Sequence, residues 1–459
     1  MHERNPYQDP KRLLWLAEKD TKLAKYINKK HKYVSVNWDD EEVKRTVSEA
    51  ILRHDFGIDV RLSSDRLCPS VPNRLNYVLW IEDLVNSLHW YDCQDPSYAR
   101  GIDIGTGSIA IYACLACKRN PLWSIVGTDI DADAIEHAKR TLDGDMSRCD
   151  DCKVTSTAQL RSRIQLIHTH GSFLDMLHLD EQYAESHESR QKVAYHFSMC
   201  NPPFYASQEE RQESTDKKQV AKTWTAGSQH ELYTPGGELA FILRLFEESQ
   251  QWCEQIVWYS SMLGKLTSVY AFVDHLRGVK HSNYAVTELV QGRTKRWVVA
   301  WSFRGSRLPD SLGRGIPKIA PASTLRAMQC EHLLNEHNST CTTAQFLSSL
   351  DITTSEGVHS HPIHANDSQC FALDFFSPVW TRSARRKRAR LESCEIQNDR
   401  PILAVNIWHA SNKLHIQWTY GMDRALFDSF SVHVFYQLRN RLSTMLQSDE
   451  LSHLQPASR

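Results

Sequence analysis

The chain has 459 residues, a formal net charge of −1 and 41% hydrophobic residues. This length predicts two or three domains and enough apolar residues for a full core. No apolar run reaches the roughly 18 residues that span a membrane, and the first residues lack the apolar stretch of a signal peptide, so neither feature is expected. The near-zero charge excludes a uniformly basic surface for coating nucleic acid, but it does not exclude a local basic groove.

The first 98 residues predict helices, with a turn at Pro69 and Pro72 and a surplus of lysine and arginine before residue 32. From Arg100 onward, short apolar strands alternate with helices. The seven strands are expected at residues 101–105, 124–128, 164–169, 196–200, 256–260, 285–290 and 296–303, with the last two joined as a hairpin. This order predicts a Rossmann-like, doubly wound and mostly parallel α/β sheet with an antiparallel edge.

Composition divides the chain into four parts. Residues 1–98 form an N-terminal helical extension, and residues 99–306 form the α/β domain. Residues 307–369 are rich in serine, threonine, histidine and proline, which predicts a partly disordered linker. Residues 370–459 regain apolar content and predict a small α+β domain. Its strands are expected near 371–376, 402–408 and 414–418, and its helix near 426–446.

A glycine-containing turn follows the first strand of the α/β domain. In Asp103-Ile104-Gly105-Thr106-Gly107-Ser108, the two glycines allow a tight turn and a close approach to a ligand. The next strand ends in Asp129, whose carboxylate can accept hydrogen bonds from both ribose hydroxyls of a nucleoside. A nicotinamide cofactor and S-adenosylmethionine both fit this pattern. Ala110 replaces the third glycine of the dinucleotide fingerprint, which favours S-adenosylmethionine.

The run Asn201-Pro202-Pro203-Phe204 ends the fourth strand, at the carboxyl edge of the sheet, where ligands bind. The lone pair of an exocyclic adenine amine is delocalised into the ring, so this amine is a poor nucleophile. The Asn201 side-chain oxygen and the Pro202 carbonyl can accept hydrogen bonds from the two N–H groups of this amine. These contacts would direct the nitrogen lone pair towards a methyl donor. Pro203 rigidifies the turn, and Phe204 can stack on the base. The motif predicts methylation of an amino group in DNA, in RNA or in a protein glutamine side chain.

These motifs resemble those of the methyltransferase-like protein 16 family over roughly residues 1–305, and more distantly those of bacterial large-subunit rRNA adenine-N6 methyltransferases. The resemblance also includes residues 71–77, 236–239, 261–265 and 291–297. It implies a class I methyltransferase fold that uses S-adenosylmethionine and forms N6-methyladenosine in U6 small nuclear RNA and in messenger RNA hairpins. It also implies a nuclear location, with the cytoplasm as an alternative.

The resemblance implies a role for individual residues. Arg74 would face the methionine carboxylate of the cofactor, Asp129 its ribose hydroxyls and Gly171 its adenine. Cofactor contacts are also implied for Asp103, Gly105, Gly107 and Asn201. RNA contacts are implied for His2, Arg4, Asn5, Arg293 and Arg296. His170 stands where the family has a lysine implicated in autoinhibition, which leaves that regulation open.

Two further segments have alternative interpretations. Residues 382–390 carry six positive charges, which predicts an RNA phosphate clamp, a nuclear localisation signal or a solvated charged surface. The polar segment 205–235 follows the Asn-Pro-Pro-Phe motif and predicts a mobile lid over the substrate, or disorder. The N-terminal extension is expected to bind RNA, and the C-terminal domain is a candidate for accessory RNA binding.

Two cysteine pairs have the spacing of zinc ligands: Cys114 with Cys117, and Cys149 with Cys152. The first pair lies in an apolar run of small residues that predicts a buried helix, whereas zinc knuckles occur in turns. Free thiols and no bound metal are therefore expected. The remaining functional alternatives are a ribosomal RNA adenine-N6 methyltransferase, a protein-glutamine methyltransferase, and an RNA-binding protein without catalysis, which the intact motifs disfavour.

Overall fold

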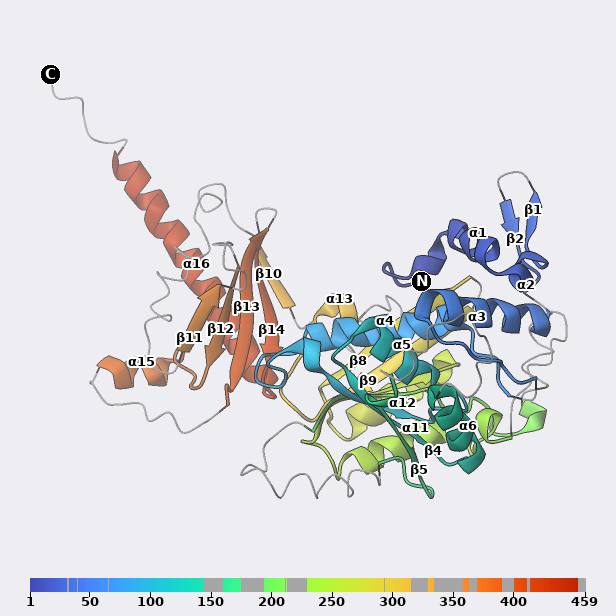
Figure 1. Ribbon diagram of the computed structural model, residues 1–459. Coiled ribbons are helices and arrows are strands. Elements are labelled where there is room, and N and C mark those ends of the chain that lie inside the picture. The colour runs from blue at the N-terminus through green and yellow to red at the C-terminus, as the bar shows by residue number, and fades with distance from the viewer. Residues whose placement is uncertain are drawn as a thin grey trace. The chain divides into compact units, whose positions relative to one another are not determined.

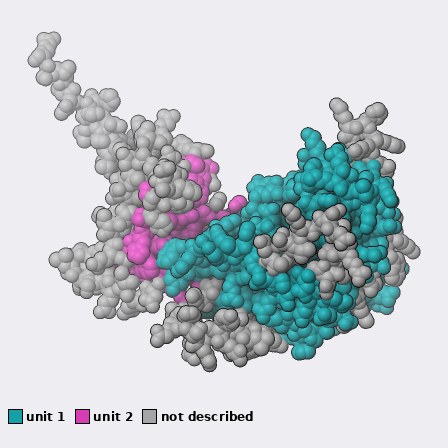
Figure 2. Space-filling model, viewed as in Figure 1, with its two compact units in different colours: residues 1–303, 312–320 teal, residues 304–311, 321–459 magenta. Residues whose placement is uncertain are grey.

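The computed structural model describes two compact units, residues 1–303 with 312–320 and residues 304–311 with 321–459 (Figure 2). Within these units it describes residues 1–30, 33–38, 40–64, 66–143, 160–174, 194–210, 212, 229–292, 294–314, 329–333, 358–362, 370–389, 400–410 and 413–452. Among these residues, no helix is long and apolar enough to cross a membrane.

The first unit is built around a seven-stranded sheet with the order β5-β4-β3-β6-β7-β9-β8. Its strands are β3 (Arg100–Ile104), β4 (Ser124–Asp129), β5 (Ile164–His168), β6 (Tyr195–Cys200), β7 (Ile256–Leu263), β8 (Tyr284–Gln291) and β9 (Thr294–Trp301). Strands β3 to β7 pair in parallel, and β9 pairs antiparallel with both β7 and β8. The prediction of a mostly parallel sheet with an antiparallel edge is confirmed.

The parallel strands are apolar because helices cover both faces of such a sheet. Every residue of β7 is buried, and so is every residue of β3 after Arg100. The covering helices are α4 (Val71–Asn86), α5 (Ile111–Arg119), α6 (Ala132–Asp143), α11 (Gly237–Ser249) and α12 (Leu266–Gly278) (Figure 1). Because β3, β4 and β6 run in the same direction, their carboxyl ends meet at one edge of the sheet.

The N-terminal part is mainly helical, as predicted, with one exception. Its elements are η1 (Pro6–Gln8), α1 (Pro10–Lys19), α2 (Thr21–Ala24), α3 (Glu41–Phe56), α4 and η2 (Pro96–Tyr98). The exception is an antiparallel hairpin of β1 (Asn28–Lys30) and β2 (Tyr33–Ser35). Tyrosine and valine in β2 favour a strand, and three-residue strands are too short to show a clear alternation in the sequence.

The second unit contains a five-stranded antiparallel sheet with the order β10-β14-β13-β12-β11. Its strands are β10 (Gln329–Leu333), β11 (Val358–Pro362), β12 (Cys370–Phe375), β13 (Leu403–Ala410) and β14 (Lys413–Tyr420). Helix α16 (Arg424–Ser452) packs Phe427, Phe430 and Val434 into the core of this unit. The three strands and the helix predicted after residue 370 are present.

The linker predicted for residues 307–369 is wrong at two places, because β10 and β11 lie inside it and form the two edges of the second sheet. Edge strands pair on one side only, so they carry polar residues such as the histidines of Val358–Pro362 and resemble loops in composition. The first stretch of the first unit also ends at Phe303, three residues before the predicted end of the α/β domain at residue 306.

Candidate active site

A cavity opens at the carboxyl ends of β3, β4 and β6, with about 1060 Å³ of empty space, part of which is open solvent at its mouth. It receives residues from the glycine turn, from α4 and from the Asn-Pro-Pro-Phe run. Lining residues include Arg74, Gly105, Gly107, Tyr112, Asp129, Thr169, Asn201, Pro202, Pro203 and Glu231. The fold thus brings together, at one site, sequence motifs that lie more than a hundred residues apart.

The turn between β3 and α5 depends on its glycines. Gly105 and Gly107 both have φ near +71°, a conformation that favours glycine, and no atom of the described residues lies within 4 Å of where a Cβ atom would stand. The backbone N–H groups of Gly105 and Thr106 both donate to the Thr128 carbonyl at 2.8 Å, which fixes the turn against β4. The result is an open backbone cradle beside the cavity.

Two aspartates stand at the ends of β3 and β4. Asp129 lines the cavity, and its carboxylate accepts hydrogen bonds from the backbone N–H groups of Gly107 at 2.9 Å and Asp131 at 3.0 Å. Burial raises its pKa above the usual value for aspartate. Asp103 is completely buried behind the cavity lining, where it accepts a hydrogen bond from the Thr106 hydroxyl at 2.7 Å. Burial raises the pKa of Asp103 to about 7.

Arg74 extends from the second turn of α4 into the cavity. Its guanidinium carbon lies 5.6 Å from the centre of the Tyr112 ring, and its charge lowers the pKa of Asp103, against the larger effect of burial. Arg74 therefore places a cation beside the glycine cradle. This arrangement fits a ligand that has a carboxylate at one end and a nucleoside at the other, which are the two ends of S-adenosylmethionine.

Asn201, Pro202 and Pro203 form the other wall of the cavity, whereas Phe204, predicted to act with them, is not among the described lining residues. The Asn201 side-chain oxygen is buried and has no hydrogen-bond partner among the described residues. A buried acceptor without a partner is costly, so this oxygen is available for a donor on a ligand. Asn201, Pro202 and Pro203 all line the cavity.

Phe204 packs against the turn after β7, and a residue of α11 holds this turn; both lie outside the predicted site residues. A Cβ atom at Gly264 would lie 2.9 Å from Phe204 Cδ1, so the ring packs directly on the backbone after β7. Glu238, at the start of α11 and 1% exposed, accepts hydrogen bonds from the backbone N–H groups of Gly264 at 2.6 Å and Lys265 at 2.9 Å. Gly264 and Glu238 belong to segments that carry the family resemblance, but the spacing of these residues alone does not indicate a role.

Arg296 lies beside the same aromatic ring. The family resemblance implied an RNA contact for Arg296, and its guanidinium carbon is 5.0 Å from the centre of the Phe204 ring. Burial and the charge of Arg74 lower the pKa of Arg296. Arg293, the other arginine predicted for this groove, lies outside the described residues.

The region after β5 is only partly as predicted. Thr169 and Phe173 line the cavity, and among the described lining residues Gly171 is absent. Gly171 has φ +113°, and its carbonyl accepts a hydrogen bond from Arg244 at 3.2 Å. The His170 ring lies 4.5 Å from the ring of His168.

Backbone hydrogen bonds join the two ends of the segment that was expected to form a lid. The Tyr205 N–H donates to the Leu232 carbonyl at 3.2 Å, and the Thr234 N–H donates to the Tyr205 carbonyl at 3.0 Å. Between these contacts, residues 213–228 lie outside the described residues, so the lid itself stays a prediction. In the basic run, α15 covers Arg382–Ala389, and Arg390 lies outside the described residues.

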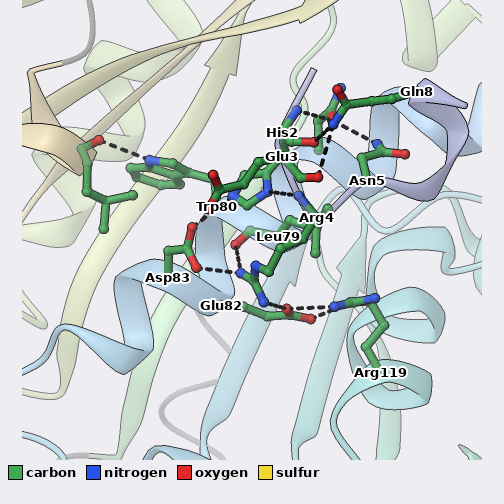
Figure 3. A network of polar contacts seen from close by, with 12 residues as sticks. His2, Glu3, Arg4, Asn5, Gln8, Leu79, Trp80, Glu82, Asp83 and Arg119 are labelled. Carbon is green, nitrogen blue, oxygen red and sulfur yellow. Dashed lines mark hydrogen bonds and ion pairs between the residues drawn. The ribbon is translucent and has the colours of Figure 1, made fainter.

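The N-terminal residues predicted to bind RNA contact the protein itself. Asn5 is 2% exposed and donates hydrogen bonds to Pro72 and Asn76 of α4. His2 contacts Asp83, and Arg4 contacts Glu82 and Asp83 (Figure 3). These three residues therefore contact α4, whereas Arg296 lies beside the Phe204 ring.

The first cysteine pair is buried in α5, as expected. The Cys114 thiol lies 3.6 Å from the Ile109 carbonyl, and the Cys117 thiol lies 3.5 Å from the Trp123 carbonyl. Burial raises the pKa of Cys117 to about 12, which disfavours the thiolate that zinc requires. Cys149 and Cys152 lie outside the described residues, and no cluster of three metal-binding side chains occurs among those described.

Comparison with known proteins identifies the family. The sequence model of a family of RNA methyltransferases matches residues 1–305. The chain belongs to this RNA methyltransferase family. S-adenosylmethionine is the cofactor of the family. This agrees with the cavity, which suits a ligand that has a carboxylate at one end and a nucleoside at the other.

Several relatives are named by their activity. The chain is 33% identical over 308 residues to the RNA N(6)-adenosine-methyltransferase mettl16 of Xenopus laevis, covering 66% of this chain and 52% of that protein. It is 30% identical over 404 residues to the U6 small nuclear RNA (adenine-(43)-N(6))-methyltransferase of Schizosaccharomyces pombe, covering 88% of this chain and 94% of that protein. The chain thus spans about half the length of the vertebrate relatives and nearly all of the fission yeast relative.

A solved structure supports the same fold. The human Mettl16 catalytic domain in complex with the MAT2A 3′UTR hairpin 1 matches with a TM-score of 0.53 and 31% sequence identity, covering 66% of this chain and 95% of that one. The match confirms the Rossmann-like class I methyltransferase fold of the first unit.

Proposed function

We propose that this protein is an S-adenosylmethionine-dependent RNA methyltransferase that forms N6-methyladenosine in U6 small nuclear RNA. The observation that carries the proposal is the buried Asn201 side-chain oxygen, which has no hydrogen-bond partner in the described part of the chain and belongs to a residue that lines the cavity beside the glycine cradle. An exocyclic amine supplies the donor that this oxygen lacks. U6 RNA as the substrate is supported by the named activity of the fission yeast relative, which aligns over nearly its whole length.

The residues of the chain perform the reaction mainly by positioning. Arg74 would hold the cofactor carboxylate and Asp129 its ribose hydroxyls. The bound cofactor supplies an electrophilic methyl group. The Asn201 side-chain oxygen and the Pro202 carbonyl would accept hydrogen bonds from the two amine N–H groups, so that the nitrogen lone pair points out of the ring plane towards that methyl group. Fixed acceptors of this kind accelerate a reaction because they need no rearrangement as charge develops.

The geometry around Phe204 suits a nucleic-acid base rather than a glutamine side chain. An aromatic face offers stacking worth ~1–3 kcal/mol per base, and Arg296 beside it supplies a cation for the adjoining phosphate. Adenine must leave its stack to reach such a site, so unpaired or bulged adenosines are favoured. The proposal includes messenger RNA hairpins as a second class of substrate. It also includes a nuclear location, since U6 RNA is the main proposed substrate.

Methylation of defined transcripts with labelled S-adenosylmethionine tests the proposal. The substrates are U6 RNA, the same RNA with its target adenosine replaced by guanosine, a large-subunit rRNA fragment and a glutamine-containing peptide. We expect label in U6 RNA alone, recovered as N6-methyladenosine after digestion, and no label in the guanosine variant. Label in the rRNA fragment or the peptide without label in U6 RNA would contradict the proposal.

A further inference from the structure

The first residues of the chain fold against α4, and Figure 3 shows His2 and Arg4 beside Leu79, Glu82 and Asp83 of this helix. The His2 backbone N–H and the Asn5 side-chain amide both donate to the Asn76 side-chain oxygen, at 3.0 and 2.8 Å. The Asn5 amide also donates to the Pro72 carbonyl at 3.0 Å. Asn5 and Asn76 are 2% and 1% exposed, so these hydrogen bonds are shielded from water.

Pro72 and Asn76 bracket Arg74 on the same helix, two residues before it and two residues after it. At 3.6 residues per turn, positions two residues apart lie on nearly opposite faces. Asn5 therefore holds the face of α4 that lies opposite Arg74, while Arg74 extends into the cavity. A shift of this turn would move the Arg74 guanidinium relative to the glycine cradle.

The far end of α4 is tied down by the same segment. Arg4 contacts Glu82 at 2.9 Å and donates to the Leu79 carbonyl at 3.1 Å. Glu82, 3% exposed, also accepts hydrogen bonds from Arg119 at 2.6 Å and Asn120 at 3.0 Å, at the end of α5. Because α5 begins directly after the glycine turn, this network fixes α4 against the helix that carries the cradle.

We propose that Asn5 is a positioning residue for the cofactor: it sets the position of Arg74 through the first turns of α4, and it does not contact RNA. Because a buried amide with three hydrogen bonds inside the protein has no donor left for a phosphate, its effect on catalysis must pass through the helix. The inference rests on the proposed role of Arg74 towards the cofactor carboxylate.

Two ligands separate this role from a general loss of stability. S-adenosylhomocysteine has the carboxylate that Arg74 would bind, whereas 5′-methylthioadenosine has the nucleoside and lacks the amino-acid part. In the full-length protein, Asn5→Ala should weaken binding of S-adenosylhomocysteine by about tenfold, the order expected for a misplaced charged hydrogen bond. Binding of 5′-methylthioadenosine should change by less than about twofold. Calorimetric titration without RNA measures both.

Three variants complete the design. Asn5→Ser keeps a hydroxyl donor and the acceptor for the Tyr7 N–H, so it should fold readily and give a smaller loss in the same direction. Glu3→Ala changes an exposed neighbour and should leave both affinities unchanged. In the Arg74→Ala background, Asn5→Ala should cause no further loss, because the group that it positions is gone.

The outcomes are distinct. The positioning role would be overturned if Asn5→Ala and Asn5→Ser weakened the binding of both ligands equally. It would also be overturned if the losses of affinity in Asn5→Ala and Arg74→Ala were fully additive, or if Asn5→Ala left the binding of both ligands unchanged. An Asn5→Ala protein that loses RNA binding but keeps its affinity for S-adenosylhomocysteine would assign the segment to RNA instead. If the unaltered protein bound neither ligand, the proposed function itself would fail.

Discussion

The family resemblance implied RNA contacts for both Arg4 and Arg296. The structure gives the two arginines different surroundings. Arg4 contacts two carboxylates of α4, one of them the buried Glu82. The Arg296 guanidinium carbon lies 5.0 Å from the centre of the Phe204 ring, directly after the cavity residues 201–203, and among the described residues Arg296 forms no ion pair. A buried carboxylate needs its cationic partners, so Arg4 is committed to the protein, whereas Arg296 can exchange its contacts for a phosphate.

The comparison teaches that the charge of a side chain predicts a function only together with its partners. A charge that neutralises a buried partner contributes to the fold, and its removal destabilises the protein. A charge beside an aromatic ring at an open cavity contributes to binding, and its removal leaves the fold intact. The two arginines thus predict different responses to the same substitution.

Arg296→Ala should cause the larger functional effect. We expect kcat/KM for U6 RNA to fall by about tenfold or more, because the variant loses a phosphate contact and the cation beside Phe204. The slope of log affinity against log salt concentration should decrease by about one unit. Arg296→Lys should recover the salt dependence but only part of the rate, since lysine lacks the planar group that stacks.

Arg4→Ala is the matched control for Arg296→Ala. It should lower the thermal stability of the protein and leave the salt dependence of RNA binding unchanged, since its charge is used by Glu82 and Asp83. Equal losses of RNA affinity and equal salt slopes in the two variants would erase the distinction between these arginines. RNA titrations at several salt concentrations, together with melting curves, measure both properties.

A smaller effect concerns pH. In the free protein, burial raises the pKa of Asp103 to about 7, so its carboxyl is mostly protonated below neutral pH. The cationic sulfonium and ammonium groups of S-adenosylmethionine favour the carboxylate, so binding should release a fraction of a proton near pH 7. Affinity should therefore rise by a few fold as the pH increases from about 6 to 8.

Calorimetry in two buffers with different ionisation enthalpies measures this proton release. Asp103→Asn cannot release the proton, so its affinity should be flatter over the same pH range. Proton uptake on binding in the unaltered protein, or an identical release in Asp103→Asn, would show that another group titrates.

The sequence predicted the first unit well because its signals are local. Buried parallel strands read as continuous apolar runs, as in Ile256–Leu263, and the glycine turn stands directly after β3. The second unit was predicted at its central strands and missed at β10 and β11. Each of these edge strands forms only by pairing with another segment, β10 with β14 and β11 with β12. The polar composition of an edge strand does not indicate which segment it pairs with.

The candidate site shows the same division. Asp129, Gly105, Gly107 and Asn201 follow strand ends, so their convergence on one cavity could be predicted from the topology of a parallel sheet. The support of Phe204 by Gly264 and Glu238, and the attachment of Asn5 to α4, could not be predicted in this way. They arise from contacts between segments far apart in the chain, which have no fixed spacing in the sequence.

The most direct test of the proposed mechanism is the single-turnover rate of Asn201→Ala with saturating S-adenosylmethionine and U6 RNA. Loss of the acceptor oxygen should lower this rate by about a hundredfold or more, with an unchanged melting temperature. Asn201→Asp, which retains acceptor oxygens, should keep more of the rate. A folded Asn201→Ala protein that methylates U6 RNA at the rate of the unaltered protein would contradict the assignment of this cavity as the site of methyl transfer.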